Sequence, residues 1–186
     1  MARPGMMLAC ALIGVSACTG SAGEIDTAPL PTAYAPPYVC DYVPKVAVER
    51  MTGITDPLVN GSLRLAREDS PANGGCSAYQ RTGERGTVLR IMLDSGGSRG
   101  QVENQLRDGN SKQLPEIVPG GFGYYANYPN DEAHVGAMLV KGQARLSIEL
   151  VKGVKGRDNA ADVVALMKLI APKLITAPSP SADQNG

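Results

Sequence analysis

The chain has 186 residues, with 18 Lys and Arg against 18 Asp and Glu, one His, four Cys and no Trp. This length allows one ordinary domain, and two would be cramped. A formal net charge of zero without a basic cluster argues against nucleic-acid binding, which needs a concentrated face of Lys and Arg. A single His argues against an imidazole-based metal site. No phosphate loop, zinc spacing or calcium loop is present, so we expect no cofactor.

The N-terminus has the three-part plan of a secretory signal. Arg3 precedes an apolar run from Met6 to Val15, and small residues follow. The run has roughly ten residues, half of what a membrane-spanning helix needs. We therefore expect residues 1–17 to be a cleaved signal peptide.

The end of this apolar run resembles the lipobox of bacterial lipoproteins, in which the Cys becomes diacylated and then N-terminal. The residues that carry the resemblance are Val15-Ser16-Ala17-Cys18, whereas Cys10 would leave too short an apolar region before it. Two acyl chains give stable anchoring where a single one is marginal. The resemblance implies a diacylglyceryl anchor on Cys18 and a position on the extracytoplasmic face of the cell membrane. The alternative is an ordinary signal peptide with a chance cysteine.

Only two cysteines remain after Cys10 leaves with the signal and Cys18 carries lipid. Cys40 and Cys76 then lie in an oxidising compartment and allow one pairing. A bridge would close a loop of about 36 residues, worth roughly 4 kcal/mol in the chain-entropy model. A reactive thiol needs a basic partner or a C-x-x-C arrangement, and neither is visible. We therefore predict a structural disulfide.

Composition sets the limits of the predicted domain. Residues 18–37 are rich in Ala, Thr and Pro and lack periodicity, which is typical of an extended linker. The last residues, 176–186, have the composition of a disordered tail. The predicted folded domain is therefore 38–175.

The first half of the domain mixes helical and strand periodicities. Apolar spacing predicts a short helix over Pro44 to Thr52, and Gly53 follows its end. Two weaker strands are predicted around Leu63 to Leu65 and Ser77 to Arg81. A stronger one is predicted from Thr87 to Asp94, where apolar and polar residues alternate.

The second half predicts three consecutive strands and a helix. The strands are Gly123 to Tyr128, Glu132 to Val140 and Gln143 to Val151, with Lys141-Gly142 as a two-residue turn. A last helix begins at Asp158 or Asn159, and Pro172 marks its end. This order predicts an α+β fold, a mainly antiparallel sheet with helices packed on one face.

One segment resembles the nucleophile elbow of serine hydrolases. Gly96-Gly97-Ser98-Arg99-Gly100 matches G-x-S-x-G, and Asp131 and His134 follow in the chain order of α/β-hydrolases. However, that class needs a parallel sheet, and residues 131 and 134 lie too close around one strand start to form a triad contact readily. The simpler interpretation is a glycine turn, after which Ser98 caps a helix that runs to about Asp108. A serine hydrolase remains the alternative function.

Aromatic residues gather in one predicted strand. Four of the eight are Phe122, Tyr124, Tyr125 and Tyr128. Alternation sends Tyr124 and Tyr128 to one face and Tyr125 to the other. Tyr rings with apolar bodies and polar tips suit a ligand cleft or a protein-binding rim, and core packing is the alternative. We take these four residues as the candidate binding surface.

The two remaining cysteines lie in the segments Cys40-Asp41-Tyr42-Val43 and Gly75-Cys76-Ser77-Ala78-Tyr79, and the stretch Gly121 to Ala126, a hairpin and a terminal helix follow. This pattern resembles that of actinobacterial surface lipoproteins of the domain of unknown function 3558 family. No Pro precedes the first Cys, and the Trp common after the second is absent. The resemblance implies no catalytic residues.

These observations lead to one functional expectation. We expect a non-enzymatic, membrane-anchored surface lipoprotein whose domain has a binding, sensor or accessory role in the cell envelope. Its partner would be the membrane through Cys18, together with an envelope protein or an apolar small molecule. We expect no nucleic-acid partner, because the charge is balanced.

Overall fold

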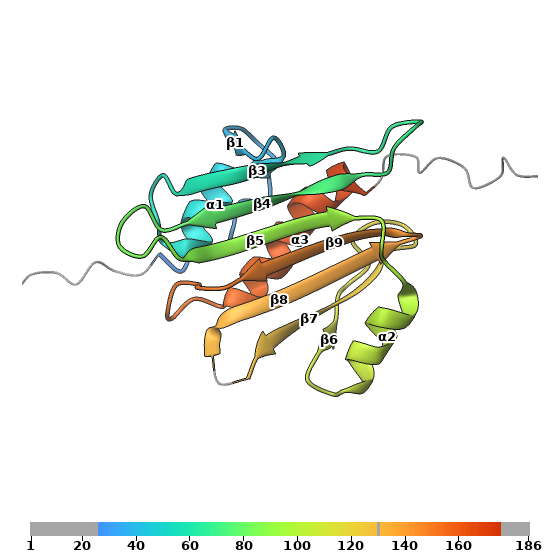
Figure 1. Cartoon of the computed structure of the whole chain (residues 1–186). Helices are drawn as coiled ribbons and strands as arrows, with labels where there is room; N and C mark the ends of the chain where they lie inside the picture. The colour runs from blue at the N-terminus through green and yellow to red at the C-terminus, as the bar shows by residue number, and fades with distance from the viewer. Residues whose placement is uncertain (1–25, 130, 176–186) are drawn as a thin grey trace, which may run out of the picture.

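The computed structural model describes residues 26–129 and 131–175, which form one antiparallel sheet with three helices (Figure 1). The sheet has seven strands in the order β3-β4-β5-β9-β8-β7-β6, and β1 and β2 form a separate two-stranded ribbon. The predicted α+β class with a mainly antiparallel sheet is confirmed. The strands are β1 Tyr38–Val39, β2 Val43–Pro44, β3 Leu58–Arg64, β4 Asn73–Tyr79, β5 Thr87–Asp94, β6 Lys112–Gln113, β7 Phe122–Tyr128, β8 Asp131–Lys141 and β9 Ala144–Leu150.

Alternating side chains give the central strands one apolar face. In β5, Leu89, Ile91 and Leu93 are buried, and their partners across the ladder in β9 are Leu150, Ile148 and Leu146. Opposed apolar pairs of this kind are the unit from which a sheet gains stability. The main core lies on this face, which we call the helix face.

Two helices cover the helix face: α1 (Lys45–Thr52) and α3 (Asn159–Leu174). In Figure 1 both lie behind the sheet. Asp158 caps the N-terminus of α3, and its side chain accepts the Ala161 N–H at 2.9 Å. The prediction that Pro172 ends this helix is wrong. The helix continues to Leu174 because its last turn packs into the core, where Ala171, Leu174 and Ile175 are buried.

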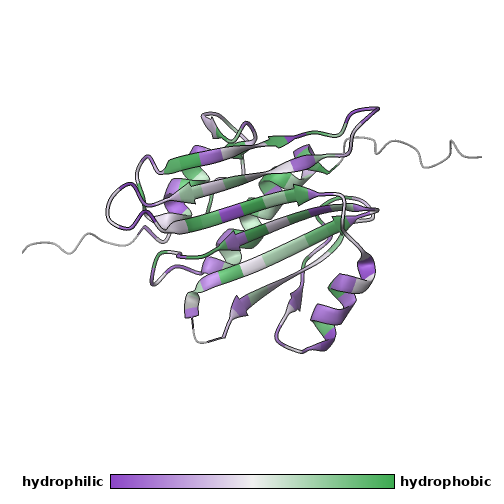
Figure 2. Ribbon diagram, viewed as in Figure 1, coloured by the Kyte–Doolittle hydropathy of each residue, from purple (hydrophilic) through white to green (hydrophobic). Residues whose placement is uncertain are grey.

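Helix α2 (Arg99–Arg107) packs on the opposite side of the sheet, against β7 and β8, so the expected packing of helices on one face describes α1 and α3 but not α2. The predicted cap is confirmed: the Ser98 hydroxyl accepts the Gln101 N–H, and the Gln101 side chain accepts the Ser98 N–H, which completes a capping box. Only Val102 is buried in this helix, and Figure 2 shows α2 as mainly hydrophilic. It covers one corner of the sheet and leaves the rest of that face open.

The hairpin between β8 and β9 differs by one residue from the prediction. Lys141 pairs with Ala144, so the two turn residues are Gly142 and Gln143 rather than Lys141 and Gly142. Gly142 has φ of 57°, which suits a residue without a Cβ. The turn follows the glycine, because that position needs positive φ.

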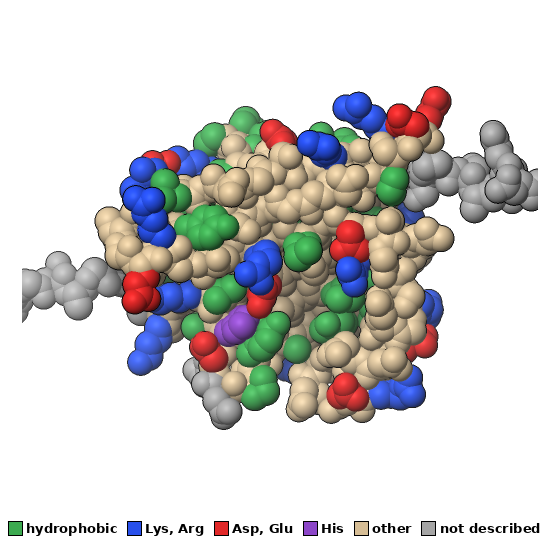
Figure 3. All heavy atoms as spheres, in the orientation of Figure 1, with side chains coloured by type: hydrophobic (Ala, Val, Ile, Leu, Met, Phe, Trp, Pro, Cys, Tyr) green, Lys and Arg blue, Asp and Glu red, His purple; other side chains and the backbone are tan. Residues whose placement is uncertain are grey.

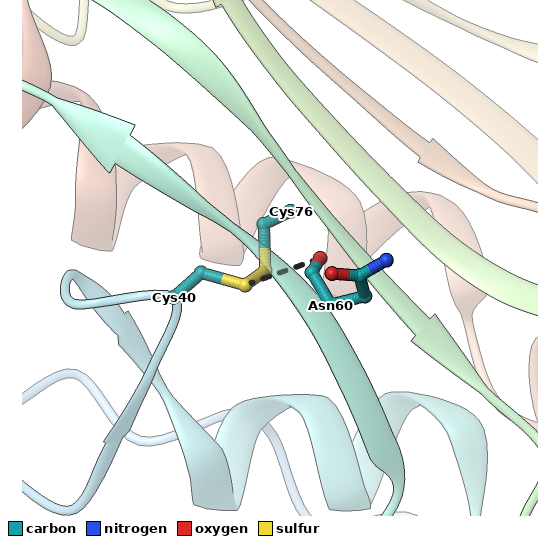
Figure 4. The surroundings of a disulfide bond; sticks show 3 residues. All are labelled: Cys40, Asn60 and Cys76. Carbon is teal, nitrogen blue, oxygen red and sulfur yellow. Dashed lines mark hydrogen bonds between the residues drawn. A yellow bond between two sulfur atoms is a disulfide. The ribbon is translucent and has the colours of Figure 1, made fainter.

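The predicted disulfide is present. Cys40 lies in the turn between β1 and β2, and Cys76 lies in β4 with its side chain toward the core (Figure 4). The Cys40 Sγ atom is 3.8 Å from the Asn60 carbonyl oxygen of the neighbouring strand β3. The bond therefore ties the ribbon that precedes α1 to the sheet.

The packed part of the chain begins earlier than the sequence indicates, because residues 26–37 lie against the domain instead of forming an extended linker. Leu30 is buried in the main core. The Arg157 guanidinium donates hydrogen bonds to the carbonyl oxygens of Asp26 and Ala28, and Arg50 donates to that of Pro29. We call residues 26–37 the N-terminal arm. Its only large apolar side chains are Leu30 and Tyr34, so no periodicity marked it as structured.

An exposed ion-pair network at the edge of α1 predicts an acid-dependent loss of stability. Asp56 lies between Lys45, 2.7 Å away, and Arg81. The hydrogen bond from Lys45 and the charges of both cations hold the pKa of Asp56 below its ordinary value of 3.8. Because the pKa is lower in the folded state, the ionised Asp56 carboxylate stabilises the protein at pH values above its ordinary pKa. This contribution disappears as pH falls through the lowered pKa.

We therefore expect the Asp56→Asn variant to be less stable than wild type at pH 7, by an amount that vanishes under strongly acidic conditions. Urea unfolding of both proteins across this pH range would measure it. A difference that stays constant as pH falls would contradict the role of the Asp56 charge.

Candidate functional site

The sheet face opposite the helix face is only partly covered, and we call it the open face. Its side chains form rows across the strands. One row contains Tyr124, Met138, Ser147, Met92 and Gly75. The next contains Ala126, Gly136, Glu149, Arg90 and Ser77. Met92 is 46% exposed, and Figure 3 shows apolar side chains between charged ones on this face.

A groove runs along the open face between α2 and strands β7 to β9. Its main part has a volume of about 450 Å³, and a smaller part of about 290 Å³ continues along α2. Gln105, Tyr124 and Met138 line both parts. This size is within the range of small-molecule sites. The groove exists because the row positions next to the two large side chains, Tyr124 and Met138, are small: Ala126, Gly136 and Ser147.

Glu149 organises one end of the groove. Its carboxylate accepts a hydrogen bond from Arg90 at 2.7 Å and lies 3.1 Å from His134 Nε2. The Tyr128 ring stacks on the His134 ring, with centroids 3.6 Å apart and planes 13° apart. Four side chains from β5, β7, β8 and β9 therefore hold one another in place, and the aromatic face at this end is fixed before any ligand arrives.

The other end of the groove is held by a second ion pair. Arg145 donates two hydrogen bonds to one Asp94 carboxylate oxygen, at 3.0 and 2.9 Å. Beside it, the Arg99 guanidinium of α2 lies 4.3 Å from the centre of the Phe122 ring, within the range of a cation–π contact. This contact fixes the first turn of α2 on the sheet and sets the width of the groove.

Both tyrosines of the groove keep their hydroxyl protons at neutral pH. Burial raises the pKa of Tyr124 above its ordinary value of 10.0. Burial, followed by the nearby Glu149 charge, raises the pKa of Tyr128. Each ring therefore offers a neutral hydroxyl that donates or accepts a hydrogen bond.

The structure separates the four predicted aromatic residues. Phe122, Tyr124 and Tyr128 lie on the open face, but Tyr125 packs against the main core on the helix face. The inclusion of Tyr125 in the candidate surface is therefore corrected, because side chains alternate along β7. Of the remaining three, Phe122 lies beneath α2, so Tyr124 and Tyr128 are the aromatic residues that line the groove.

Sequence reasoning missed much of the groove. It did not select Gln105, Met138, Ser147 and Glu149, although alternation within β8 and β9 assigns the last three to one face. Gln105 carried no signal of its own, because only the packing of α2 brings it over the sheet.

The structure does not bring the proposed serine, aspartate and histidine together. Gly97, next to Ser98, donates a backbone hydrogen bond to Gln143 at the start of β9. His134 contacts Glu149, which lies six residues after Gln143 along β9. At the rise of a β-strand, this separates the surroundings of Ser98 from those of His134 by roughly 20 Å. The Asp131 carboxylate accepts the backbone N–H of Ala133.

Ser98 is therefore expected to act as a helix cap. Replacing Ser98 with Ala should lower the unfolding free energy by about 1 kcal/mol, whereas Ser98→Asp should keep wild-type stability, because Asp caps equally well. Urea unfolding would measure both. We expect no reaction of the full chain with a fluorophosphonate probe. Labelling of the wild type that is lost in Ser98→Asp would show that Ser98 is a nucleophile as well as a helix cap.

The predicted lipid anchor on Cys18 and the predicted signal peptide lie outside the described residues. Within residues 26–129 and 131–175, no cluster of three or more His, Cys, Asp or Glu side chains is arranged to hold a metal ion. Over the same residues, none of the helices has both the length and the apolar character needed to span a membrane.

The protein is thus an α+β domain with one disulfide, one sheet face covered by α1 and α3, and one open sheet face that carries a groove. Compared with known proteins, the chain matches no family model, and neither a similar curated protein nor a similar solved structure was found.

Proposed function

We propose that this protein is a bacterial surface lipoprotein, anchored through Cys18, whose domain binds an envelope component in the open-face groove without catalysing a reaction. The groove carries the proposal. It combines two tyrosine rings, a thioether and amides in a concave surface, which suits a recognition site. The lipobox, and the resemblance to the domain of unknown function 3558 family, support the placement in the envelope.

Anchoring is tested by metabolic labelling with an alkyne fatty acid in a bacterial host that processes lipoproteins. We expect the wild type to be labelled and Cys18→Ser to be unlabelled and released from the membrane fraction. Cys10→Ser serves as the matched control and should be labelled like the wild type. Unlabelled wild-type protein would contradict the anchor.

Binding in the groove is tested by photo-crosslinking in living cells. A photoreactive amino acid at Gln105, in the wall of the groove, should form an adduct, whereas the same residue at Lys168, on α3, should not. Gly136 lies in the groove floor, where an added Cβ would be 3.4 Å from the Tyr128 ring.

We expect Gly136→Ala to reduce the adduct by occupying space in the groove. Gly75→Ala is the matched control, since it adds the same methyl group to the same open face outside the groove, 3.8 Å from its nearest neighbour. An adduct that is absent from the wild type, or equally strong in both variants, would overturn the binding proposal.

A further inference from the structure

The polar lining of the groove has unused hydrogen-bonding capacity. Gln105 and Asn110 contribute amides to it, and Ser147 contributes a hydroxyl. Within the described part of the chain, none of these three side chains forms a hydrogen bond with another residue. They come from α2, from the segment that follows it and from β9, and all line the same hollow.

An apolar ligand would be a poor match for this lining. Covering an amide or a hydroxyl without giving it a partner costs about 1–3 kcal/mol for each group. A ligand that carries its own hydroxyls and amides avoids this cost, because each lining group then regains a hydrogen bond.

The charges around the groove are already paired. Among the side chains that the structure describes, Glu149 is the only charged one that lines the main part, and Arg90 and His134 hold its carboxylate. With the same restriction, Arg145 is the only charged one in the smaller part, and Asp94 holds its guanidinium. Recognition of a phosphate or carboxylate would need a cation that is free to form a bidentate contact. The groove instead matches an uncharged ligand.

The aromatic and thioether surfaces of the groove favour a ligand that has a flat, weakly polar face. Tyr124 and Met138 form the floor, and Tyr128 stands at the end with 44% of its surface exposed. A pyranose ring has such a face in its C–H groups and has hydroxyls around its edge. Amphipathic tyrosine rings suit this combination of contacts.

On these grounds we propose that the groove binds a neutral carbohydrate chain, with sugar rings against Tyr124 and Tyr128 and hydroxyls on the amides of Gln105 and Asn110. This inference rests on the proposed function, since it names the class of ligand for the same groove. The two connected parts lie along α2, so the site accepts successive sugar units of an extended chain.

The test is isothermal titration calorimetry of the full chain, purified in a polyoxyethylene detergent that contains no sugar. The probes are cellohexaose and N-acetylchitohexaose as neutral chains, hexagalacturonate as an anionic chain of equal length, and laurate as an amphiphile with a long apolar chain and a carboxylate. We expect at least one neutral hexaose to bind, and the two other probes to bind more weakly or not at all.

Variants locate the binding. Gly136→Ala should weaken the neutral hexaose roughly tenfold, because the added methyl group occupies space on the groove floor, whereas Gly75→Ala should leave its affinity within about twofold. Gln105→Leu removes one amide from an exposed helix position and should weaken the hexaose without weakening laurate. Circular dichroism of each variant would confirm that it is folded.

The outcomes separate the two proposals. If neither neutral hexaose binds, if the anionic chain or laurate binds more tightly, or if Gly136→Ala has no effect, the carbohydrate inference is overturned. If the groove adduct in living cells still depends on Gly136, the proposed binding function stands with a different ligand. If that adduct is also absent, both proposals fail.

Discussion

Replacing both Cys40 and Cys76 with Ala is expected to lower the free energy of unfolding by about 4 kcal/mol. The bond joins residues separated by 36 positions, and opening it restores the conformational freedom of that loop in the unfolded chain. The loop contains β2, α1 and β3. Loss of the disulfide therefore also affects how the β1–β2 ribbon packs on the sheet. Urea unfolding monitored by circular dichroism would measure the change.

Reduced wild-type protein provides the control for the cysteine variant. Reduction should lower the unfolding free energy by a similar amount, because it opens the same loop without altering side-chain packing at Cys76, which is 3% exposed. A loss below about 1 kcal/mol in both samples would mean that the bond contributes little to stability.

The Arg157→Ala variant is expected to lose about 3–5 kcal/mol of unfolding free energy, because removing one partner of a buried ion pair leaves the other charge uncompensated. Arg157 and Asp162 are 3% and 6% exposed, and two hydrogen bonds of 2.8 Å join them. This geometry raises the pKa of Arg157, which therefore stays charged. Urea unfolding would measure the loss.

The same variant should release the N-terminal arm. Arg157 donates hydrogen bonds to two arm carbonyl groups, so hydrogen exchange at Leu30 should accelerate in Arg157→Ala. Glu103→Ala is the matched control: it breaks an exposed ion pair within α2, and its expected cost is about 0.3–0.5 kcal/mol. Equal losses of unfolding free energy in Arg157→Ala and Glu103→Ala would contradict the claim that the buried ion pair contributes more than the exposed one.

The arm also affects the reach of the predicted anchor. With residues 26–37 on the domain, only the segment from Cys18 to Asp26 would separate the lipid from the folded part. That segment is less than half as long as the linker of about 20 residues that the sequence predicts. The domain would then lie close to the membrane surface.

Local patterns predicted most elements of the fold. The strand from Thr87 to Asp94 and the Ser98 cap are found where the sequence places them, because alternation and capping depend on residues a few positions apart. The end of α3 was misplaced, because Pro172 was judged by its local preference while the burial of Leu174 decided the outcome. The N-terminal arm was missed for the same reason, since its contacts with Arg157 span more than 120 positions.

The sequence predicted only part of the candidate site. Alternation correctly separated Tyr124 and Tyr128 from Tyr125, because the side chains of a strand point to opposite faces in turn. The residues that complete the groove lie on α2, β8 and β9, and their proximity to the tyrosines depends on strand order and on the side of the sheet that α2 covers.

Counting the cysteines predicted the pairing of Cys40 with Cys76, once the two others were assigned to the predicted signal and lipid anchor. Alternation predicted which strand residues share a face, because the period of two is a property of the extended chain. Tertiary contacts, in contrast, place β9 between β5 and β8 and α2 over one corner of the open face. Backbone hydrogen bonds hold the strands together without regard to side-chain identity, so this neighbour order, and the groove that it creates, depend on how the whole apolar surface is buried.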